Sequence, residues 1–294
     1  MKKIIFSVLM SSLFVPVYAQ QYQVITVQGG EVGVNTAARA RQKEIGKADM
    51  EFIYDYRRLT DTTDVSSEKK DLMILQISQG MSKFSSYRTM QVDSLISAST
   101  VDQIKANPGN YAGGETFSIY KNYPQGKLTT MDKIAMDWFM YEEDIPVQEW
   151  NIDDSATKEI AGYVCRRAEC DFRGRKYIAW YTGEIPLAEG PWKFGGLPGL
   201  IMEVGDTEGH YQFTLTGINP NATRPVTIPD VQSNKTSRGK FYAAKRKYDT
   251  DPIGYISAVQ GIKLTVTTPG GAPPSNEMMK PRELQYDYIE RDYK

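Results

Sequence analysis

The sequence predicts a mainly β protein, built as a strongly curved antiparallel sheet or a partly open β-barrel with one or two short helices. Three observations support this prediction. Apolar and polar residues alternate with a period of two in many short segments, turn-forming residues separate those segments, and segments with a helical period are few. An antiparallel sheet with one face on the core and the other in solvent produces this alternation. A chain of 294 residues is long enough to bury a full core of this kind.

The first 19 residues have the pattern of a secretory signal peptide. Lys2 and Lys3 precede an apolar run, and the small residue Ala19 ends it, which predicts cleavage after Ala19. We expect residues 20–294 to form a single, mostly antiparallel β domain with long surface loops, in the periplasm or secreted. No later segment approaches the roughly 20 apolar residues of a membrane-spanning helix, so we expect no transmembrane segment.

The following elements are predicted in chain order. Two segments are candidates for short helices, the polar segment 35–47 and the segment 131–140. The clearest strand is MEFIYDYR, in which Phe52, Tyr54 and Tyr56 share one face. The same alternation marks HYQFTLTGI at 210–218 and IKLTVT at 262–267. Long surface loops are predicted at 107–114, 219–238 and 269–281, where Pro, Gly, Asn, Thr and Ser are frequent.

A continuous series of strands is predicted from about residue 149 to residue 218. Arg173-Gly174-Arg175 separates two alternating segments, and the segment 206–209 (DTEG) separates the next two, so both are predicted hairpin turns.

The glycine-rich stretch FGGLPGLIMEVGD, at 194–206, raises the question of a ligand site. A phosphate-binding loop would need a helix after its glycines, whereas these glycines precede LIMEV, which alternates as a strand does. Leu197-Pro198-Gly199-Leu200 fits a type II turn, with a positive φ at Gly199. We interpret the stretch as a buried structural corner that leads one strand into the next.

The same stretch carries a family resemblance. GLPGLI, at 196–201, resembles the signature of the GLPGLI family of exported proteins of the Bacteroidota, also called the Porphyromonas-type family of unknown function. Upstream, IAGYVC at 160–165, Trp180-Tyr181 and Ile185-Pro186 fall in the order expected for that family. The resemblance implies an exported protein of the cell envelope. It implies no established chemistry for these residues.

Charge and cysteine content exclude several classes of protein. The net charge is −1 at pH 7, which argues against a nucleic-acid partner because such proteins present a basic surface. Cys165 and Cys170 lie in a segment predicted to be extended, where roughly 3.3 Å per residue would separate them by about 16 Å. A disulfide needs Cα atoms within about 7 Å. We expect two thiols, at least one of them buried, unless a bulge or bend brings them together.

The sequence contains few residues that could form a catalytic or a metal site. The chain has one histidine, His210, which we expect to be exposed beside a turn, and no motif combines a nucleophile with a base. A zinc site would need Cys165, Cys170 and His210 to converge, and Met278-Met279 could bind copper(I). Two acidic runs, Glu142-Glu143-Asp144 and Asp153-Asp154, could serve a carboxylate-dependent hydrolase. We interpret the first run as a solvated turn and expect no cofactor.

Aromatic residues are unusually frequent between Phe172 and Phe213. They either form a two-sided core or line an apolar concavity that binds a lipid, a peptide or a segment of an outer-membrane protein client. We expect a non-enzymatic, exported accessory protein of the envelope, with a carboxylate-dependent hydrolase and a copper or zinc protein as alternatives. The residues predicted to contact a ligand are Tyr177, Trp180, Tyr181, Trp192 and Phe194.

Overall fold

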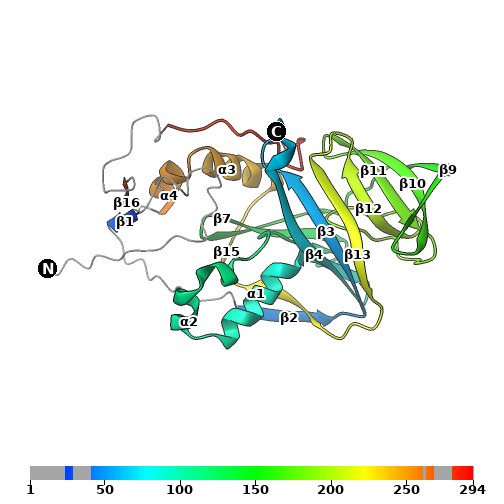
Figure 1. The fold of residues 1–294 in the computed structure, drawn as a ribbon, viewed down its shortest axis with the longest axis horizontal. Coiled ribbons are helices and arrows are strands. Elements are labelled where there is room, and N and C mark those ends of the chain that lie inside the picture. The colour runs from blue at the N-terminus through cyan, green and yellow to red at the C-terminus, as the bar shows by residue number, and fades with distance from the viewer. Residues whose placement is uncertain (1–23, 29–40, 261–262, 268–279, 294) are drawn as a thin grey trace.

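A twelve-stranded sheet forms the centre of the computed structural model, which describes residues 24–28, 41–260, 263–267 and 280–293 (Figure 1). All neighbouring strands are antiparallel except β15 and β8, which are parallel. In sheet order the strands are β15 (Ser233–Lys235), β8 (Asp137–Asp144), β7 (Lys127–Ile134), β6 (Ser118–Lys121), β5 (Met81–Ser86), β4 (Glu68–Ser78), β3 (Met50–Leu59), β13 (Tyr211–Asn219), β12 (Leu200–Asp206), β11 (Arg175–Thr182), β10 (Tyr163–Phe172) and β9 (Asn151–Ile160).

Smaller elements surround this sheet. Two further strand pairs are β1 (Val24–Gln28) with β16 (Lys263–Thr267), and β2 (Arg41–Lys47) with β14 (Pro225–Asp230). The helices are α1 (Tyr87–Ala98), α2 (Val101–Ala106), α3 (Arg238–Thr250) and α4 (Pro252–Gln260), with short 3-10 turns at Val65–Ser67 and Pro108–Tyr111. None of the helices in the described part of the chain combines the length and apolar character that crossing a bilayer requires.

The sheet is strongly curved. Phe84 on β5 and Phe213 on β13 lie three strands apart, which is about 14 Å in a flat sheet, yet their ring centroids are 5.8 Å apart. The Tyr54 hydroxyl on β3 donates to the Ile201 carbonyl on β12, two strands away, at 2.8 Å. Within the described residues the end strands β15 and β9 do not pair with each other. The predicted mainly β fold, a curved antiparallel sheet that is not closed, is therefore confirmed.

The main core lies on the concave face of the sheet. Phe52, Tyr54 and Tyr56 on β3 are buried together with residues of β4, β5, β10, β11, β12 and β13, so the alternation read in MEFIYDYR faces the core as predicted. A second, smaller core joins β7 and β8 to α3 and to the C-terminal residues 280–293. The space between these two cores contains the cavity described below.

Both predicted hairpin turns are confirmed. Arg173 and Gly174 have φ angles of 52° and 78° and join β10 to β11, as a two-residue hairpin loop of the primed type requires. The segment 206–209 joins β12 to β13, with Gly209 at φ 75°.

Both helix predictions are wrong. Residues 131–140 form the facing ends of β7 and β8, joined by Ala135 and Met136, because Ile134 pairs with Asp137. Ala135 has φ 55°, and a turn made by Ala without Gly or Asn gives no sequence signal. Of the segment 35–47, residues 35–40 lie outside the described residues, and the rest is β2, which pairs with β14. Pairing with a distant strand outweighs local helix preference there.

The loop predictions are partly wrong. The segment 219–238 contains β14 and β15, and prolines are tolerated in β14 because it belongs to a two-stranded pair with a free edge. The segment 107–114 contains the short 3-10 turn but no α-helix or strand. The segment 269–281 lies outside the described residues except for its last two positions. The described residues contain four α-helices, where one or two short helices were expected.

Candidate functional site

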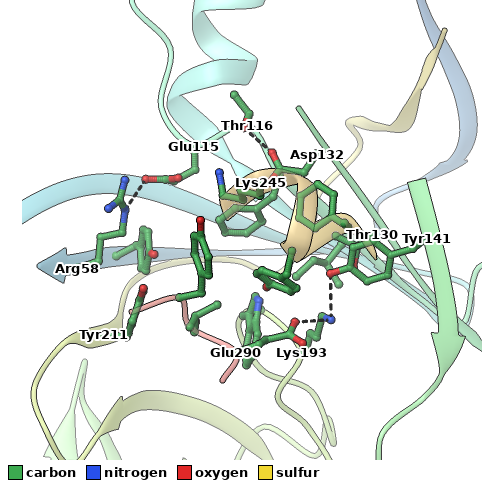
Figure 2. A pocket seen from close by; sticks show the side chains of 18 of the residues that line it. Arg58, Glu115, Thr116, Thr130, Asp132, Tyr141, Lys193, Tyr211, Lys245 and Glu290 are labelled. Atoms are coloured by element: carbon green, nitrogen blue, oxygen red, sulfur yellow. Dashed lines mark hydrogen bonds and ion pairs between the residues drawn. The ribbon is translucent and has the colours of Figure 1, made fainter. Parts of the chain in front are cut away.

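A cavity of about 120 Å³ lies between the concave sheet, α3 and the C-terminal segment 280–293, which we call the strap (Figure 2). Strands β3, β6, β7 and β8 form one wall, α3 a second, and the strap a third. Trp192 and Lys193, from the connection between β11 and β12, reach the cavity as well. The residues that line it are Tyr56, Arg58, Glu115, Thr116, Phe117, Ile119, Thr130, Asp132, Tyr141, Trp192, Lys193, Tyr211, Phe241, Tyr242, Lys245, Tyr286, Tyr288, Ile289 and Glu290.

Helix α3 brings three lining residues to the cavity. Ser237 caps the helix by accepting from the Lys240 amide, as serine commonly does at a helix start. Phe241, Tyr242 and Lys245 then lie at helical spacing on one side. The Phe241 ring centroid lies 5.4 Å from that of Tyr141 on β8, which fixes the helix against the sheet.

Side-chain hydrogen bonds, one buried and two partly buried, hold residues 287–289 of the strap. The Arg175 guanidinium donates to the Tyr288 carbonyl at 3.0 Å, the Tyr177 hydroxyl donates to the Ile289 carbonyl at 3.3 Å, and the Tyr211 hydroxyl donates to the Asp287 carbonyl at 2.5 Å. Exposed and less exposed residues alternate along it from position 281 to 290. The strap is therefore an extended segment with one face towards the cavity.

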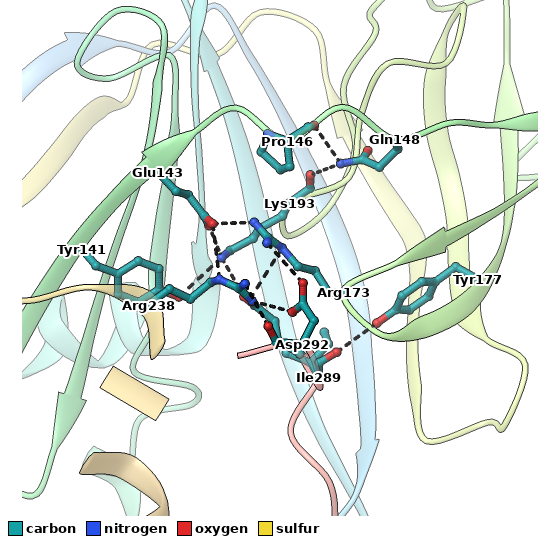
Figure 3. Close-up of polar contacts among 11 residues, drawn as sticks. Tyr141, Glu143, Pro146, Gln148, Arg173, Tyr177, Lys193, Arg238, Ile289 and Asp292 are labelled. Carbon is teal, nitrogen blue, oxygen red and sulfur yellow. Dashed lines mark hydrogen bonds and ion pairs between the residues drawn. The ribbon is translucent and has the colours of Figure 1, made fainter. Parts of the chain in front are cut away.

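A network of charges closes one side of the cavity (Figure 3). Lys193 bonds Glu290 at 2.6 Å and also contacts Glu143, and Arg238 lies 2.7 Å from Glu290. Burial disfavours the charged ammonium of Lys193, but Tyr141, Glu290 and Glu143 outweigh it and raise its pKa. Glu290 and Lys193 are almost completely buried, whereas Glu143 on β8 and Arg238 on α3 keep 15% and 20% of their side chains exposed. The network therefore joins the strap to β8 and α3 through one buried ion pair and its partly exposed neighbours.

Two further carboxylates line the opposite side. Burial opposes ionisation of Glu115, but Arg58, at 3.1 Å, and Lys69, at 3.4 Å, outweigh it and lower its pKa to about 2. Burial raises the pKa of Asp132, and the favourable contacts of its carboxylate offset this only in part. Those contacts include Thr116, whose hydroxyl donates to Asp132 at 2.5 Å. The two carboxyl groups thus have opposite pKa shifts within one cavity.

Of the five residues predicted to contact a ligand, Trp192 lines the cavity. Tyr177, Tyr181 and Phe194 are buried in the main core, where the Phe194 ring lies 4.7 Å from the Tyr177 ring. Trp180 is partly buried, and the Lys158 ammonium lies 4.5 Å above its ring. The structure thus brings Tyr177, Trp192 and Phe194 together as packed neighbours.

The connection between β11 and β12, residues 183–199, fills the concave face of the sheet where a ligand was expected. The Lys121 ammonium on β6 bonds Glu189 at 2.8 Å and also contacts the carbonyl of Phe194. Leu197 and Leu200 are buried. The aromatic residues of this region therefore pack against the chain itself.

The glycine-rich corner needs its glycine. Gly199 has a positive φ of 149°, as predicted, and a Cβ there would lie 2.0 Å from the Thr182 carbonyl oxygen. The predicted type II bond is absent from this described turn, because the Leu200 amide donates to the Ile185 carbonyl instead. The backbone at Gly199 lies so close to the backbone at Thr182 that no side chain would fit at position 199.

His210 is not exposed, contrary to expectation, because it lies in a cluster at the turn between β12 and β13. Its side chain is 15% exposed and its Nδ1 lies 3.3 Å from Glu208. Ligand atoms of Asp206, Glu208 and His210 lie within 4.8 Å of one another, but the Arg175 guanidinium already bonds Asp206 at 2.7 Å and lies 3.4 Å from His210. A guanidinium thus occupies the position where a metal ion would neutralise these carboxylates.

The other residues proposed for metal binding or catalysis lie elsewhere. Cys165 and Cys170 are free and buried, as predicted, and burial raises their pKa values to about 11 and 12, which disfavours the thiolate that binds metals. Met278 and Met279 lie outside the described residues. Glu142-Glu143-Asp144 belong to β8, so the predicted solvated turn is wrong. Asp153-Asp154 belong to β9 and do not line the cavity.

Most residues of the cavity were not recognised in the sequence. The alternation of Tyr286, Tyr288 and Glu290 in QYDYIERDY is a period-two signal that could have identified the strap. Ser237 is a helix-capping residue that could have marked the start of α3, but RGKFYAAKRKYDT is too polar to suggest a buried face. Glu115 and Asp132 carry no local signal, because only the sheet brings them to one cavity.

Comparisons with known proteins give a limited result. No curated protein matches this chain. Two solved structures of PNGF-II are similar to parts of it: one, in space group P21, has 11% identity and a TM-score of 0.46 over 68% of this chain and 33% of that chain. The other, in space group C2, has 12% identity and a TM-score of 0.41 over 64% of this chain and 31% of that chain. This chain thus spans about a third of those chains.

Residues 172–203 match the model of a family described as "Protein of unknown function (Porph_ging)", which confirms the resemblance carried by the glycine-rich corner.

Proposed function

We propose that the protein is an exported, non-enzymatic accessory protein of the cell envelope that holds one small group of a client molecule in the cavity beneath the strap. The observation that carries this proposal is the cavity itself, since protein interiors are otherwise close-packed. Its walls combine aromatic and aliphatic side chains with eight polar or charged side chains, and binding sites likewise join apolar walls to polar groups that fix the orientation of a ligand. The signal-peptide pattern of residues 1–19 supports export.

The size of the cavity favours a client side chain over a lipid. Its volume is about 120 Å³, and an apolar protein cavity of roughly 150 Å³ is known to hold benzene. The volume is therefore enough for at most a single ring or a short branched chain, and an acyl chain does not fit. We infer that the client is an extended peptide segment of an envelope protein that inserts one side chain.

The cavity proposal is tested by filling the space. Thr130 lines the cavity, and its neighbour Thr129 on the same strand does not. Native mass spectrometry of the protein purified from its own envelope should detect a bound peptide in the wild type. The peptide should be lost in Thr130→Leu and retained in Thr129→Leu, with both variants folded by circular dichroism. Retention in Thr130→Leu would contradict binding in the cavity.

A further variant separates the cavity from the aromatic sheet face predicted from the sequence. Trp180→Phe changes a partly buried ring on β11 that does not line the cavity, so the peptide should stay bound. Loss of the peptide in Trp180→Phe alone would place the binding site on β11 instead. N-terminal sequencing of the same preparation should begin at Gln20, and a retained Met1 would contradict export.

A carboxylate-dependent hydrolase is the second candidate, and one observation favours it. Asp132, with a raised pKa, and Glu115, ionised, line the same cavity, and such a division suits a general acid and a charged partner. Against it, Arg58 and Lys69 hold Glu115 and reduce its basicity. Hydrolysis of 4-nitrophenyl glycosides or esters that is abolished by Asp132→Asn would establish this function. If the wild type and Asp132→Asn hydrolyse these substrates at the same background rate, a hydrolase function is excluded for them.

A further inference from the structure

Two tyrosine hydroxyls in the cavity have no hydrogen-bond partner among the described residues. Tyr56 on β3 is 3% exposed and Tyr242 on α3 is 7% exposed, and both line the cavity. Neither hydroxyl oxygen is completely enclosed by protein atoms, so each borders the open space. Buried polar groups are nearly always hydrogen-bonded, so these two hydroxyls indicate that a partner enters the cavity from outside.

The charged groups of the cavity, by contrast, are already paired. Arg58 bonds Glu115 at 3.1 Å, Lys193 bonds Glu290 at 2.6 Å, and Lys245 lies 3.7 Å from Asp249. Asp132 accepts from the Thr116 hydroxyl and from the Lys133 amide. A charged ligand would lose its hydration, which is unfavourable. An anion would find each cation of the lining already paired, and a cation would find only Asp132, whose burial favours the uncharged carboxyl. The cavity therefore suits an uncharged group.

The apolar part of the wall sets the shape of that group. Phe117, Ile119, Trp192 and Phe241 contribute rings and a branched chain to the lining. Aromatic walls favour an aromatic guest because rings gain from edge-to-face and offset contacts beyond the area that they bury. The volume, about 120 Å³, is slightly below the roughly 150 Å³ of an apolar cavity that holds benzene, so it limits the guest to a single ring.

We propose that the cavity selects an uncharged ring bearing a hydroxyl, and that the inserted client group is the side chain of a tyrosine. This inference rests on the proposed function and names the group that the site recognises. A phenol can both donate to and accept from the hydroxyls of Tyr56 and Tyr242. A phenylalanine side chain would fill the same space and leave both hydroxyls unpaired.

The test compares four small probes of similar size by ligand-observed NMR titration of the full mature protein: p-cresol, toluene, 4-methylbenzoate and 4-methylbenzylamine. We expect p-cresol to bind about three- to tenfold more tightly than toluene, as one or two hydrogen bonds would give. Both charged probes should bind at least tenfold more weakly than p-cresol. Equal affinities for p-cresol and toluene would overturn the inference.

Tyrosine-to-phenylalanine variants assign the preference to particular hydroxyls. In Tyr56→Phe/Tyr242→Phe the affinity for p-cresol should fall to that for toluene, whereas the affinity for toluene stays unchanged. Tyr248→Phe is the matched control, because Tyr248 makes an edge-to-face contact with Tyr255 outside the cavity, and the preference should persist there. A preference that survives in the double variant would overturn the inference.

A pair of extended peptides that differ only in a central Tyr or Phe then tests the client. The Tyr peptide should bind more tightly than the Phe peptide by a ratio similar to that of the small probes, and equal binding of the two would overturn the assignment to tyrosine. The two proposals fail differently. If toluene binds and p-cresol has no advantage, binding in the cavity stands and the selection of a hydroxyl is wrong. If neither probe binds, cavity binding is contradicted as well.

Discussion

Replacing Glu290 by glutamine should be one of the most destabilising conservative changes in this protein. The carboxylate is fully buried, 2.6 Å from Lys193 and 2.7 Å from Arg238. Glu290→Gln keeps the shape of the side chain but removes the charge that neutralises three cations, since Arg173 also lies 3.7 Å from this carboxylate. Breaking one partner of a buried ion pair costs about 3–5 kcal/mol, because the remaining charge is left without compensation.

The expected value lies near the lower limit of that range. Lys193 and Arg173 keep their contacts with Glu143, and Arg238 keeps Asp292 at 2.5 Å, so none of the three cations loses every partner. We therefore expect a loss of about 3 kcal/mol, which is a factor of roughly 150 in the folding equilibrium. The strap should detach from the network first, since Glu290 is its most deeply buried contact.

Equilibrium unfolding in urea measures this change as a lower midpoint with an unchanged slope. Asp292→Asn is the matched control, because Asp292 belongs to the same network and contacts Arg238, yet its side chain is 40% exposed. An exposed ion pair contributes less than about 1 kcal/mol. The reasoning is refuted if Glu290→Gln costs no more than Asp292→Asn.

Three other predictions concern the corner, the cavity and the thiols. Gly199→Ala should cost about 2–4 kcal/mol, because a Cβ would meet the carbonyl oxygen of residue 182 at 2.0 Å, whereas Gly183→Ala, with its nearest atom at 3.7 Å, should cost less than about 1 kcal/mol in the same thermal melts. The pKa of Glu115 is lowered from 4.5 to about 2, so its contribution, roughly 2–3 kcal/mol, is present above pH 4.5 and is lost as the pH falls towards 2. In Glu115→Gln the free energy of unfolding should change less with pH between 4.5 and 2 than in the wild type. The same pH dependence in the variant and the wild type would contradict the stabilising ion pair. Finally, a thiol reagent at pH 8 should label neither Cys165 nor Cys170 in the folded protein and both in urea; rapid labelling of the native protein would show that the thiols are not buried.

The fold class could be predicted from the sequence because each strand carries its own evidence. Phe52, Tyr54 and Tyr56 alternate with polar residues wherever the strand lies in the sheet, since the side chains of any strand point alternately to its two faces. The turn at Arg173-Gly174 depends on backbone conformations that few residues adopt, so it too is visible locally. The positive φ at Gly199 was predictable for the same reason.

The two wrong helix predictions show where local evidence fails. The segment 131–140 has apolar residues at spacings that suit a helix, and only the pairing of β7 with β8 makes it two strands. Apart from Gly46, the segment 41–47 consists mainly of good helix formers. Pairing with β14, almost two hundred positions later in the chain, decides its conformation. Strand pairing depends on residues that are distant in sequence, so no local window contains the information.

Residue types and their periodicity alone determined that this chain forms an antiparallel sheet, turns at Arg173-Gly174 and needs glycine at position 199. Only the tertiary structure decided what the aromatic residues do. Their number indicated either a core or a ligand site, and Phe194, within the 183–199 connection, packs against Tyr177 on β11 in the main core. The cavity arises where β3, β7, α3 and the strap meet. Its position follows from the curvature of the sheet and from long-range contacts such as Lys193 with Glu290, which are properties of the folded chain and not of any segment.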